Sequence, residues 1–175
     1  DDDGCPVAPG EVGELWLKTP SSMVGYRNNP EATASTLVGG WLRTGDRAQV
    51  DDQGCYRLAG RMDDMYIRGG YNVHPQEVEA VISTHDGVAE VTVVPRTDPV
   101  LGQVGVAVIV PTDPDHPPTL NDLVRISRAA LAAYKVPEDL LVVDALPLNS
   151  AHKLDRRALS QVVAEDPSTG SNDER

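Results

Sequence analysis

The sequence has no long apolar run, few basic residues and only two cysteines, and each shortage argues against a class of protein. No apolar run approaches the roughly 20 residues that a membrane-spanning helix needs. Basic residues number 15 against 27 acidic ones, and the net charge of -12 argues against nucleic acid or an anionic membrane as the main partner. Cys5 and Cys55 have neither metal-ligand spacing nor a Cys-x-x-Cys neighbour, so we expect reduced thiols in a cytoplasmic protein.

Two familiar sequence patterns are also missing. There is no glycine-rich phosphate loop of the form G-x-x-x-x-G-K-[ST], and no signal peptide. The chain begins Asp-Asp-Asp and soon enters a strand-like segment, so we expect it to be a piece of a longer protein. Its 175 residues, 40% of them apolar, are nevertheless enough to bury a core.

The first sixty residues carry the signals of short strands. The segment EVGELWLKT at Glu11–Thr19 alternates partly and predicts a strand. Asn29 before a proline predicts the start of a short helix, which the Gly39-Gly40 pair would end. The segments on either side of Asp51–Gly54 predict two strands joined by a tight turn. We therefore expect a small β-rich subdomain here.

After Arg61 the pattern changes to strands that alternate with helices. Thr119, with Asp122 three residues later, predicts a capping box that opens a helix. The other expected elements are strands at Met65–Ile67, Val88–Val94, Gln103–Val110 and Leu140–Val143, and helices at Pro75–Thr84 and Asp155–Val163. These elements predict an α+β domain with a mixed three-stranded sheet, followed by a disordered tail at residues 166–175.

The stretch GRMDDMYIRGGYNVHPQEVE, from Gly60 to Glu79, combines a Gly-Arg turn, an acidic pair, a double glycine and a proline-led helix. It resembles the junction between the large and small domains of AMP-forming acyl-CoA synthetases, in the adenylate-forming superfamily. Further matches extend the resemblance over nearly the whole chain. It implies that residues 1–60 are the C-terminal β-rich subdomain of the large domain, that 61–63 form a hinge, and that 64–165 form a small lid domain.

Asp46 and Arg61 are the candidate nucleotide-binding residues. Thr44-Gly45-Asp46, preceded by Trp41, is similar to the family's W-x-x-T-G-D segment, in which the aspartate accepts hydrogen bonds from the ribose hydroxyls of ATP or AMP. Two carboxylate oxygens suit two vicinal O–H donors. Arg61 matches the family arginine that contacts the same ribose or its phosphate, a role that suits a planar guanidinium. The alternative is that Asp46 caps a turn and Arg61 pairs with a surface acid.

Three further positions match family positions with known roles. Asp63 matches the hinge about which the small domain rotates, and Gly69 and Gly70 match the glycines that the CoA thiol passes. Asp63 stands at the hinge, where one residue absorbs the backbone rotation that swings the small domain. The two glycines would let the thin thiol arm of CoA pass close to the backbone, since they lack Cβ atoms. A plain turn at a strand end would also use two glycines. The following Tyr71–Pro75 segment resembles acyl-CoA synthetases more than peptide synthetases, which favours CoA as the acceptor.

Lys153 is the candidate catalytic residue. It lies in LPLNSAHKLDRRAL, which resembles the family's L-P-x-x-x-x-G-K-x-x-R segment, whose lysine binds oxygens of the carboxylate and the α-phosphate during adenylation. An ammonium can stabilise the negative charge that develops at phosphorus in that step. His152 stands where the family has glycine, which puts the flexibility of the loop in doubt. The alternative interpretation of Lys153 is an ordinary surface lysine.

The resemblance implies the C-terminal part of an ATP-dependent acyl-CoA synthetase for a carboxylic acid, expected to be a fatty acid. Its substrates would be ATP, which yields AMP, and CoA; magnesium would accompany ATP in the N-terminal domain outside this chain, and the chain alone would be inactive. Two alternatives remain open. One is a fatty-acyl-AMP ligase or amino-acid adenylation domain that loads a carrier protein. The other is a non-catalytic lid module that binds a nucleotide, CoA or a partner protein.

Overall fold

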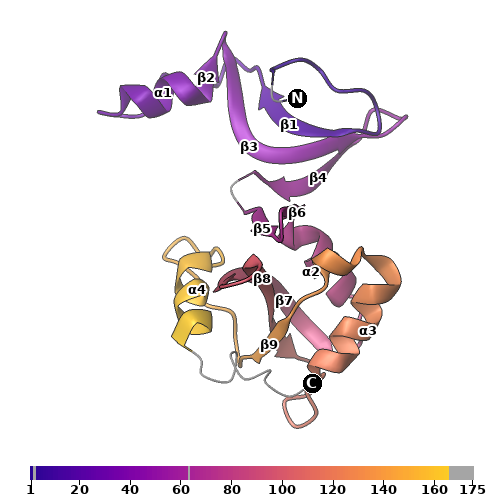
Figure 1. Ribbon diagram of the computed structural model, residues 1–175. Helices are drawn as coiled ribbons and strands as arrows, with labels where there is room; N and C mark the ends of the chain where they lie inside the picture. Colours follow the sequence, from indigo (N-terminus) through magenta and orange to yellow (C-terminus); the bar gives the residue numbers. More distant parts are fainter. Residues whose placement is uncertain (2, 63, 166–175) are drawn as a thin grey trace. The chain divides into compact units, whose positions relative to one another are not determined.

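The computed structural model describes residues 1, 3–62 and 64–165, which fall into two compact units, Asp1–Asp64 and Met65–Arg175 (Figure 1). Each unit has its own β-sheet, and the two are described separately. The expected hinge residue Asp63 and the expected disordered tail 166–175 lie outside the described residues. Within the described part of the chain, no helix is long and apolar enough to cross a membrane.

The first unit is built on a four-stranded antiparallel sheet in which β3 is central. Its elements in chain order are β1 (Val12–Leu17), α1 (Pro30–Thr36), β2 (Leu37–Val38), β3 (Trp41–Val50) and β4 (Tyr56–Arg61). Strand β3 pairs with the other three strands. The predicted turn between β3 and β4 is confirmed, because one Asp51 carboxylate oxygen accepts from the backbone N–H groups of Gln53 and Cys55, at 3.0 and 2.9 Å.

Helix α1 begins as predicted but ends earlier. Its start is capped by Asn29, whose Oδ1 accepts from the N–H of Ala32 at 3.0 Å. The prediction that the Gly39-Gly40 pair ends this helix is wrong. The helix ends at Thr36, and the glycine pair forms the two-residue turn from β2 to β3, with φ of 59° and 82°. Such a turn needs positive φ at both positions, which glycine supplies without strain.

The second unit has the predicted α+β fold. Its elements are β5 (Tyr66–Arg68), β6 (Tyr71–Val73), α2 (Pro75–Ile82), β7 (Val88–Asp98), β8 (Gly102–Pro111), α3 (Leu120–Ala130), the 3₁₀ helix η1 (Ala133–Lys135), β9 (Asp139–Val142) and α4 (Arg156–Glu165). Strands β7, β8 and β9 form the predicted mixed sheet, with β7 antiparallel and β9 parallel to β8. The hairpin β5–β6 adds two strands to it through the pairing of Arg68 with Gly102.

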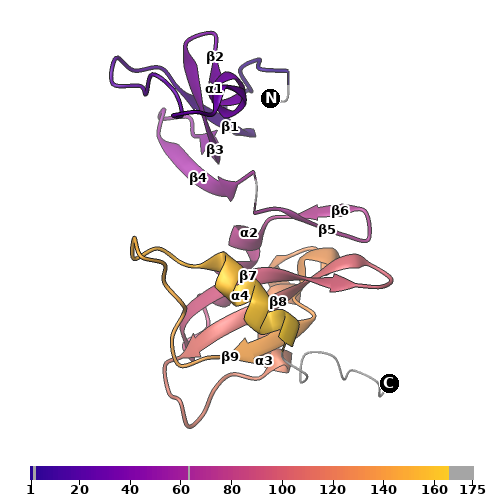
Figure 2. The ribbon, with the colours of Figure 1, turned by 90° about the vertical axis from the view of Figure 1, so that its left-hand side faces the viewer.

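Helices cover both faces of this sheet (Figures 1 and 2). Val93 of β7 packs with α2 and α3, in a core that includes Val78, Ile82 and Leu123. The next residue, Val94, packs on the opposite face against Leu159 and Val163 of α4. Because successive side chains of a strand point to opposite faces, a strand buried on both faces has a continuous apolar sequence. The β-branched runs of β7 and β8 therefore reflect this layered packing.

Helix α3 starts at the predicted capping box. The Thr119 hydroxyl accepts from the N–H of Asp122 at 3.3 Å, and the Asp122 carboxylate accepts from the N–H of Thr119 at 3.0 Å. The hydrogen bonds from the side chain and backbone of Thr119 lower the pKa of Asp122 below its usual value. The two residues therefore fix the first turn of α3 over the sheet.

Candidate functional site

Asp46 and Arg61 face each other on adjacent strands of the first unit. They are directly paired across β3 and β4, and Arg61 Nε lies 3.5 Å from Asp46 Oδ1. The side chains are 37% exposed for Asp46 and 54% exposed for Arg61, so both remain accessible to a ligand. A carboxylate and a guanidinium placed side by side in this way can accept from hydroxyl donors and donate to anionic oxygens of one ligand.

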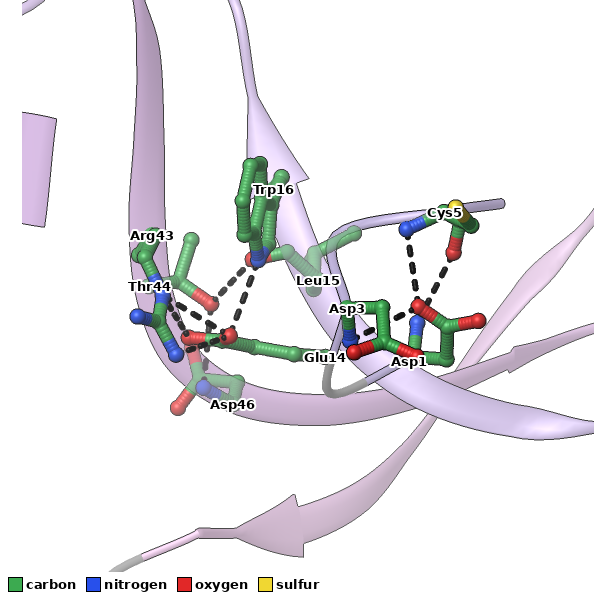
Figure 3. Close-up of polar contacts among 9 residues, drawn as sticks. All are labelled: Asp1, Asp3, Cys5, Glu14, Leu15, Trp16, Arg43, Thr44 and Asp46. Carbon is green, nitrogen blue, oxygen red and sulfur yellow. Dashed lines mark hydrogen bonds and ion pairs between the residues drawn. The ribbon is translucent and has the colours of Figure 1, made fainter. Parts of the chain in front are cut away.

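The backbone around Asp46 is held by Thr44. The Thr44 hydroxyl donates to the carbonyl oxygen of Leu15 at 2.8 Å and accepts from the N–H of Asp46 at 3.0 Å (Figure 3). Between them Gly45 has φ of 73°, and a Cβ there would lie 3.3 Å from Nη2 of Arg61. The Thr-Gly-Asp order therefore has a local reason: threonine anchors the segment to β1, and glycine leaves room for the arginine.

A second charged cluster lies next to this segment, and no motif in the sequence had indicated it. The Glu14 carboxylate accepts from Arg43 Nη2 at 2.8 Å and from the Trp16 indole N–H at 2.9 Å, as Figure 3 shows. Burial raises the pKa of Glu14, but the hydrogen bonds from Arg43 and Trp16 outweigh burial and leave that pKa below its usual value. The side chain of Glu14 is only 9% exposed, so Asp46 is the more accessible of the two carboxylates.

The two candidate glycines of the second unit form the turn of the hairpin β5–β6. Gly69 and Gly70 have φ of 55° and 87°, the sign pattern of a type I′ turn. The Gly69 N–H donates to the carbonyl oxygen of Leu101 at 2.8 Å, which ties the turn to the β7–β8 connection. Apart from Gly70 and its two neighbours in the chain, no described residue has an atom within 4 Å of the point where a Gly70 side chain would begin. The turn conformation explains both glycines, and the open side of Gly70 leaves the backbone accessible.

Residues that follow this turn are held by contacts within the second unit. Tyr71 stacks on Tyr134, with ring centroids 4.6 Å apart and ring planes 16° from parallel. Lys135, next to Tyr134, forms an ion pair with Glu77 of α2. His74 occupies the N-cap position of α2 without a capping hydrogen bond from its side chain, and its backbone is extended. These contacts fix the hairpin relative to α2 and η1.

Lys153 lies in a short hairpin that leads into α4. Leu148 and Leu154 pair as an isolated bridge, and the Asn149 N–H donates to the carbonyl oxygen of Lys153 at 2.7 Å. The Asn149 side-chain oxygen accepts from the N–H groups of Ala151 and Lys153 at 2.9 and 3.2 Å. The Lys153 side chain is exposed, and its ammonium has no hydrogen-bond or ion-pair partner among the described residues. A fixed backbone thus carries a free cationic side chain.

The backbone of His152 shows how a non-glycine residue fits this hairpin. Its φ is 55°, in the left-handed region where glycine is strain-free and other residues incur a cost of about 1–2 kcal/mol. Its N–H nevertheless donates to the carbonyl oxygen of Asn149 at 2.9 Å, so the hairpin retains its shape. The sequence departs from the family glycine here, but the backbone keeps a conformation that glycine favours.

The structure pairs two of the expected site residues with each other and places three others in hairpins of the second unit. Asp46 and Arg61 are paired in the first unit, whereas Gly69, Gly70 and Lys153 lie in two different hairpins of the second unit. No set of three or more His, Cys, Asp or Glu side chains in residues 1, 3–62 and 64–165 could hold a metal ion.

Comparisons with known proteins identify relatives of both units. A model of the AMP-binding enzyme C-terminal domain family matches residues 77–153. A 2-succinylbenzoate–CoA ligase of Geobacillus sp. (strain WCH70) is 38% identical over 161 residues, which are 92% of this chain and 32% of the relative. A long-chain-fatty-acid–CoA ligase of Salmonella typhimurium is 40% identical over 159 residues, 91% of this chain and 28% of that protein. The chain therefore spans about a third of the length of these relatives.

Solved structures match the fold over nearly the same span. The amide bond synthetase McbA of Marinactinospora thermotolerans aligns with a TM-score of 0.86 at 35% identity, over 94% of this chain and 33% of that one. The o-succinylbenzoate CoA synthetase of Bacillus subtilis, in complex with the acyl-adenylate intermediate OSB-AMP, aligns with a TM-score of 0.79 at 36% identity, over 90% and 32%.

Proposed function

Because the chain belongs to the adenylate-forming superfamily and carries its AMP-binding enzyme C-terminal domain, we propose that it is the C-terminal part of an AMP-forming acid–CoA ligase. Such a ligase joins a carboxylic acid to ATP, giving an acyl-adenylate and pyrophosphate. It then transfers the acyl group to the thiol of CoA and releases AMP. Magnesium would accompany ATP in the part of the ligase that this chain does not include.

The observation that carries the proposal is the Asp46–Arg61 pair on β3 and β4. Asp46 would accept hydrogen bonds from the two ribose hydroxyls, because its side chain is partly exposed and its pairing with Arg61, at 3.5 Å, leaves acceptor capacity on the carboxylate. Arg61 would donate to the same ribose or its phosphate, a role that suits its planar guanidinium. The pair thus offers the acceptors and donors that a ribose phosphate requires.

The second unit would supply the remaining chemistry in turn. Lys153 would bring its ammonium to the carboxylate and α-phosphate oxygens during adenylation, where negative charge accumulates. The Gly69-Gly70 turn would then line the path of the CoA thiol in the second step. Rotation of the small domain about the hinge residue Asp63 would exchange these two hairpins at one reaction centre.

The acid that this ligase activates would belong to the fatty or aryl carboxylic acids. Relatives include ligases of long-chain fatty acids, 2-succinylbenzoate and ferulate, so the similarity supports both classes. The pocket that selects the acid would lie in a portion of the ligase outside this chain.

A second candidate acceptor is an amine. The chain also matches an amide bond synthetase at 35% identity, and that enzyme's name indicates transfer to nitrogen. A carrier-protein thiol is the third acceptor that the adenylation chemistry allows. These candidates share the first half-reaction and differ in the second.

An acceptor assay with the full-length parent protein tests the proposal. The parent would be supplied with ATP, magnesium and a panel of fatty and aryl acids, and pyrophosphate release would identify the acid that is activated. CoA, a carrier protein and simple amines would then be offered separately. We expect thioester formation with CoA, and no pyrophosphate release by the 175-residue chain alone. Robust transfer to carrier protein or amine, with none to CoA, would exclude the CoA ligase.

A further inference from the structure

Side chains from three elements of the second unit meet at the outer edge of β7. Glu79 of α2 accepts at Oε1 from the Thr92 hydroxyl at 3.0 Å and from the Val93 N–H at 2.8 Å. Arg156, the first residue of α4, donates from Nη1 to the Val93 carbonyl oxygen at 3.2 Å and to the Thr92 hydroxyl oxygen at 3.3 Å. Its Nη2 lies 3.4 Å from the same Glu79 oxygen. We call Glu79, Thr92, Val93 and Arg156 the β7 clamp.

The β7 clamp occupies a position that strand pairing leaves open. Strand β7 is an edge strand of its sheet, so the Val93 N–H and C=O that point away from β8 have no partner strand in the described structure. Glu79 satisfies the donor and Arg156 satisfies the acceptor. The clamp is also well shielded, since Thr92 is 1% exposed and the Glu79 side chain 18% exposed. Loss of one charged member of the clamp would leave the other as an unpaired, partly buried charge, and would leave a backbone group of Val93 without its hydrogen bond.

The clamp joins the two layers that cover the sheet. Helix α2 packs on the face to which Val93 points, and α4 packs on the face to which Val94 points. Arg156 therefore reaches around the edge of β7 from one layer to Glu79 in the other. An ion pair that bridges two layers fixes the start of α4 more closely than apolar packing does, because hydrogen bonds are directional.

The start of α4 in turn carries the hairpin of Lys153. The Asp155 N–H donates to the carbonyl oxygen of Pro147 at 2.8 Å, which closes the base of the hairpin. The Asp155 carboxylate accepts from the N–H of Ala158 at 3.0 Å, so the same residue caps α4. Asp155 thus belongs to both elements and is adjacent to Arg156. The hairpin and the first turn of α4 consequently share one anchor.

We propose that Arg156 is a positioning residue for Lys153: through the β7 clamp it fixes the first turn of α4, and with it the place at which the hairpin presents the lysine ammonium. This inference rests on the proposed function of Lys153 in adenylation. The role suits arginine better than lysine, because a planar guanidinium reaches the Val93 carbonyl, the Thr92 hydroxyl and Glu79 at once, whereas an ammonium would keep only part of these contacts.

Arg96 of β7 provides a matched control for Arg156. Its Nη1 donates to Asp139 of β9 at 2.8 Å, and the two side chains are 23% and 20% exposed. Arg156 and Glu79 are 30% and 18% exposed. Both arginines thus form partly buried ion pairs that involve β7, but the ion pair of Arg96 is with Asp139 of β9 and not with α2 or α4.

The test measures the two half-reactions of the parent protein separately. Adenylation is followed by pyrophosphate release, and thioester formation is followed from supplied acyl-adenylate and CoA. Displacement of a catalytic group by about 1 Å can cost about 100-fold in rate. We expect Arg156→Ala to lower the kcat of adenylation by about 10- to 100-fold and thioester formation by less than about twofold, with partial recovery in Arg156→Lys. Equal loss in both steps, or the same loss in Arg96→Ala, would overturn the proposal.

A second readout does not depend on enzymatic activity. Hydrogen exchange in this chain would report the amides of Val93, Lys153 and Asp155 directly. We expect exchange at all three to be at least about tenfold faster in Arg156→Ala than in the unsubstituted chain, and unchanged in Arg96→Ala. Unchanged exchange at Lys153 and Asp155 would show that Arg156 does not fix the hairpin of Lys153. A parent that forms no acyl-adenylate would refute the proposed function, and the exchange result would still decide whether the clamp holds the hairpin.

Discussion

Tyr66 is a buried phenol at the start of β5, and its hydroxyl lies against the backbone of β8. It is 1% exposed, and its hydroxyl has no hydrogen-bond partner among the described residues. A Cβ at Gly105 would collide with that hydroxyl, which explains why β8 has glycine there. Burial raises the pKa of Tyr66 to about 12, because the charged phenolate is poorly solvated inside the fold.

The raised pKa of Tyr66 predicts a loss of stability at alkaline pH. The folded-state value of about 12 exceeds the usual 10.0, so the stabilisation is complete below pH 10 and is lost as pH rises toward 12. Two pH units correspond to about 2–3 kcal/mol. We expect Tyr66→Phe to change the free energy of unfolding at pH 7 by less than about 1 kcal/mol, because the hydroxyl has no partner among the described residues.

Urea unfolding of the wild type and of Tyr66→Phe at pH 7 and between pH 10 and 12 measures this effect. The wild type should lose more stability than the variant over the alkaline range. Parallel curves for the two proteins would contradict the assignment of the alkaline loss to Tyr66.

Among single residues, the sequence indicated candidates where a motif marks them, and their roles stay predictions. The Thr-Gly-Asp segment and Arg61 were identified as candidates, and the structure pairs Asp46 with Arg61 at 3.5 Å. The partners Glu79 and Arg156 lie 77 positions apart, in two separate motif segments, and no sequence signal indicates that the two residues meet. Their contact depends on the packing of α2 and α4 on opposite faces of one strand, which a linear pattern does not encode.

At the scale of elements, the hairpin β5–β6 allows a test of the two interpretations of Gly69 and Gly70. The glycines serve either the turn alone or also the passage of the CoA thiol. Asn-Gly is a favoured pair for a type I′ turn, so Gly69→Asn should preserve the hairpin. A side chain starting at Gly69 would make an ordinary contact with Leu101 at 3.4 Å. We expect the free energy of unfolding to change by less than about 1 kcal/mol, and thioester formation by the parent to slow by about tenfold or more while adenylation is unaffected.

Chemical unfolding and the two half-reaction assays check this prediction together. If thioester formation in Gly69→Asn equals that of the wild type while the fold is retained, the glycines serve the turn alone. The proposed path of CoA past this hairpin would then be wrong.

The predicted elements were those with long or chemically distinct signals. The β-branched runs predicted β7 and β8, and Thr119 with Asp122 predicted the start of α3. Strand β6 was missed, because its three residues, Tyr71–Val73, include the polar Asn72 and lack the short apolar run that indicated β5. The Gly39-Gly40 pair was assigned to a helix end, since glycine marks helix ends and tight hairpin turns alike. Pairing of β2 with β3 decides between them.

At the scale of the whole molecule, the candidate site residues are distributed over two units with separate sheets. The first unit carries the Asp46–Arg61 pair, which would bind the nucleotide, and the second carries Lys153 and the glycine turn in two different hairpins. In the proposed ligase, a lid that serves two half-reactions would need two distinct active surfaces, and the two hairpins of the second unit would meet that need. The sequence resemblance implied this division, and the fold of the second unit matches known adenylate-forming enzymes.

The most direct test of this account is Lys153→Ala in the full-length parent, with adenylation and thioester formation measured separately. Loss of the ammonium removes the charge that would stabilise the transition state of the first step, so adenylation should fall by about 100-fold or more. Thioester formation from supplied acyl-adenylate should remain within about twofold of the wild type, because that step would not use Lys153. Equal loss of both steps, or full adenylation by the variant, would contradict the account.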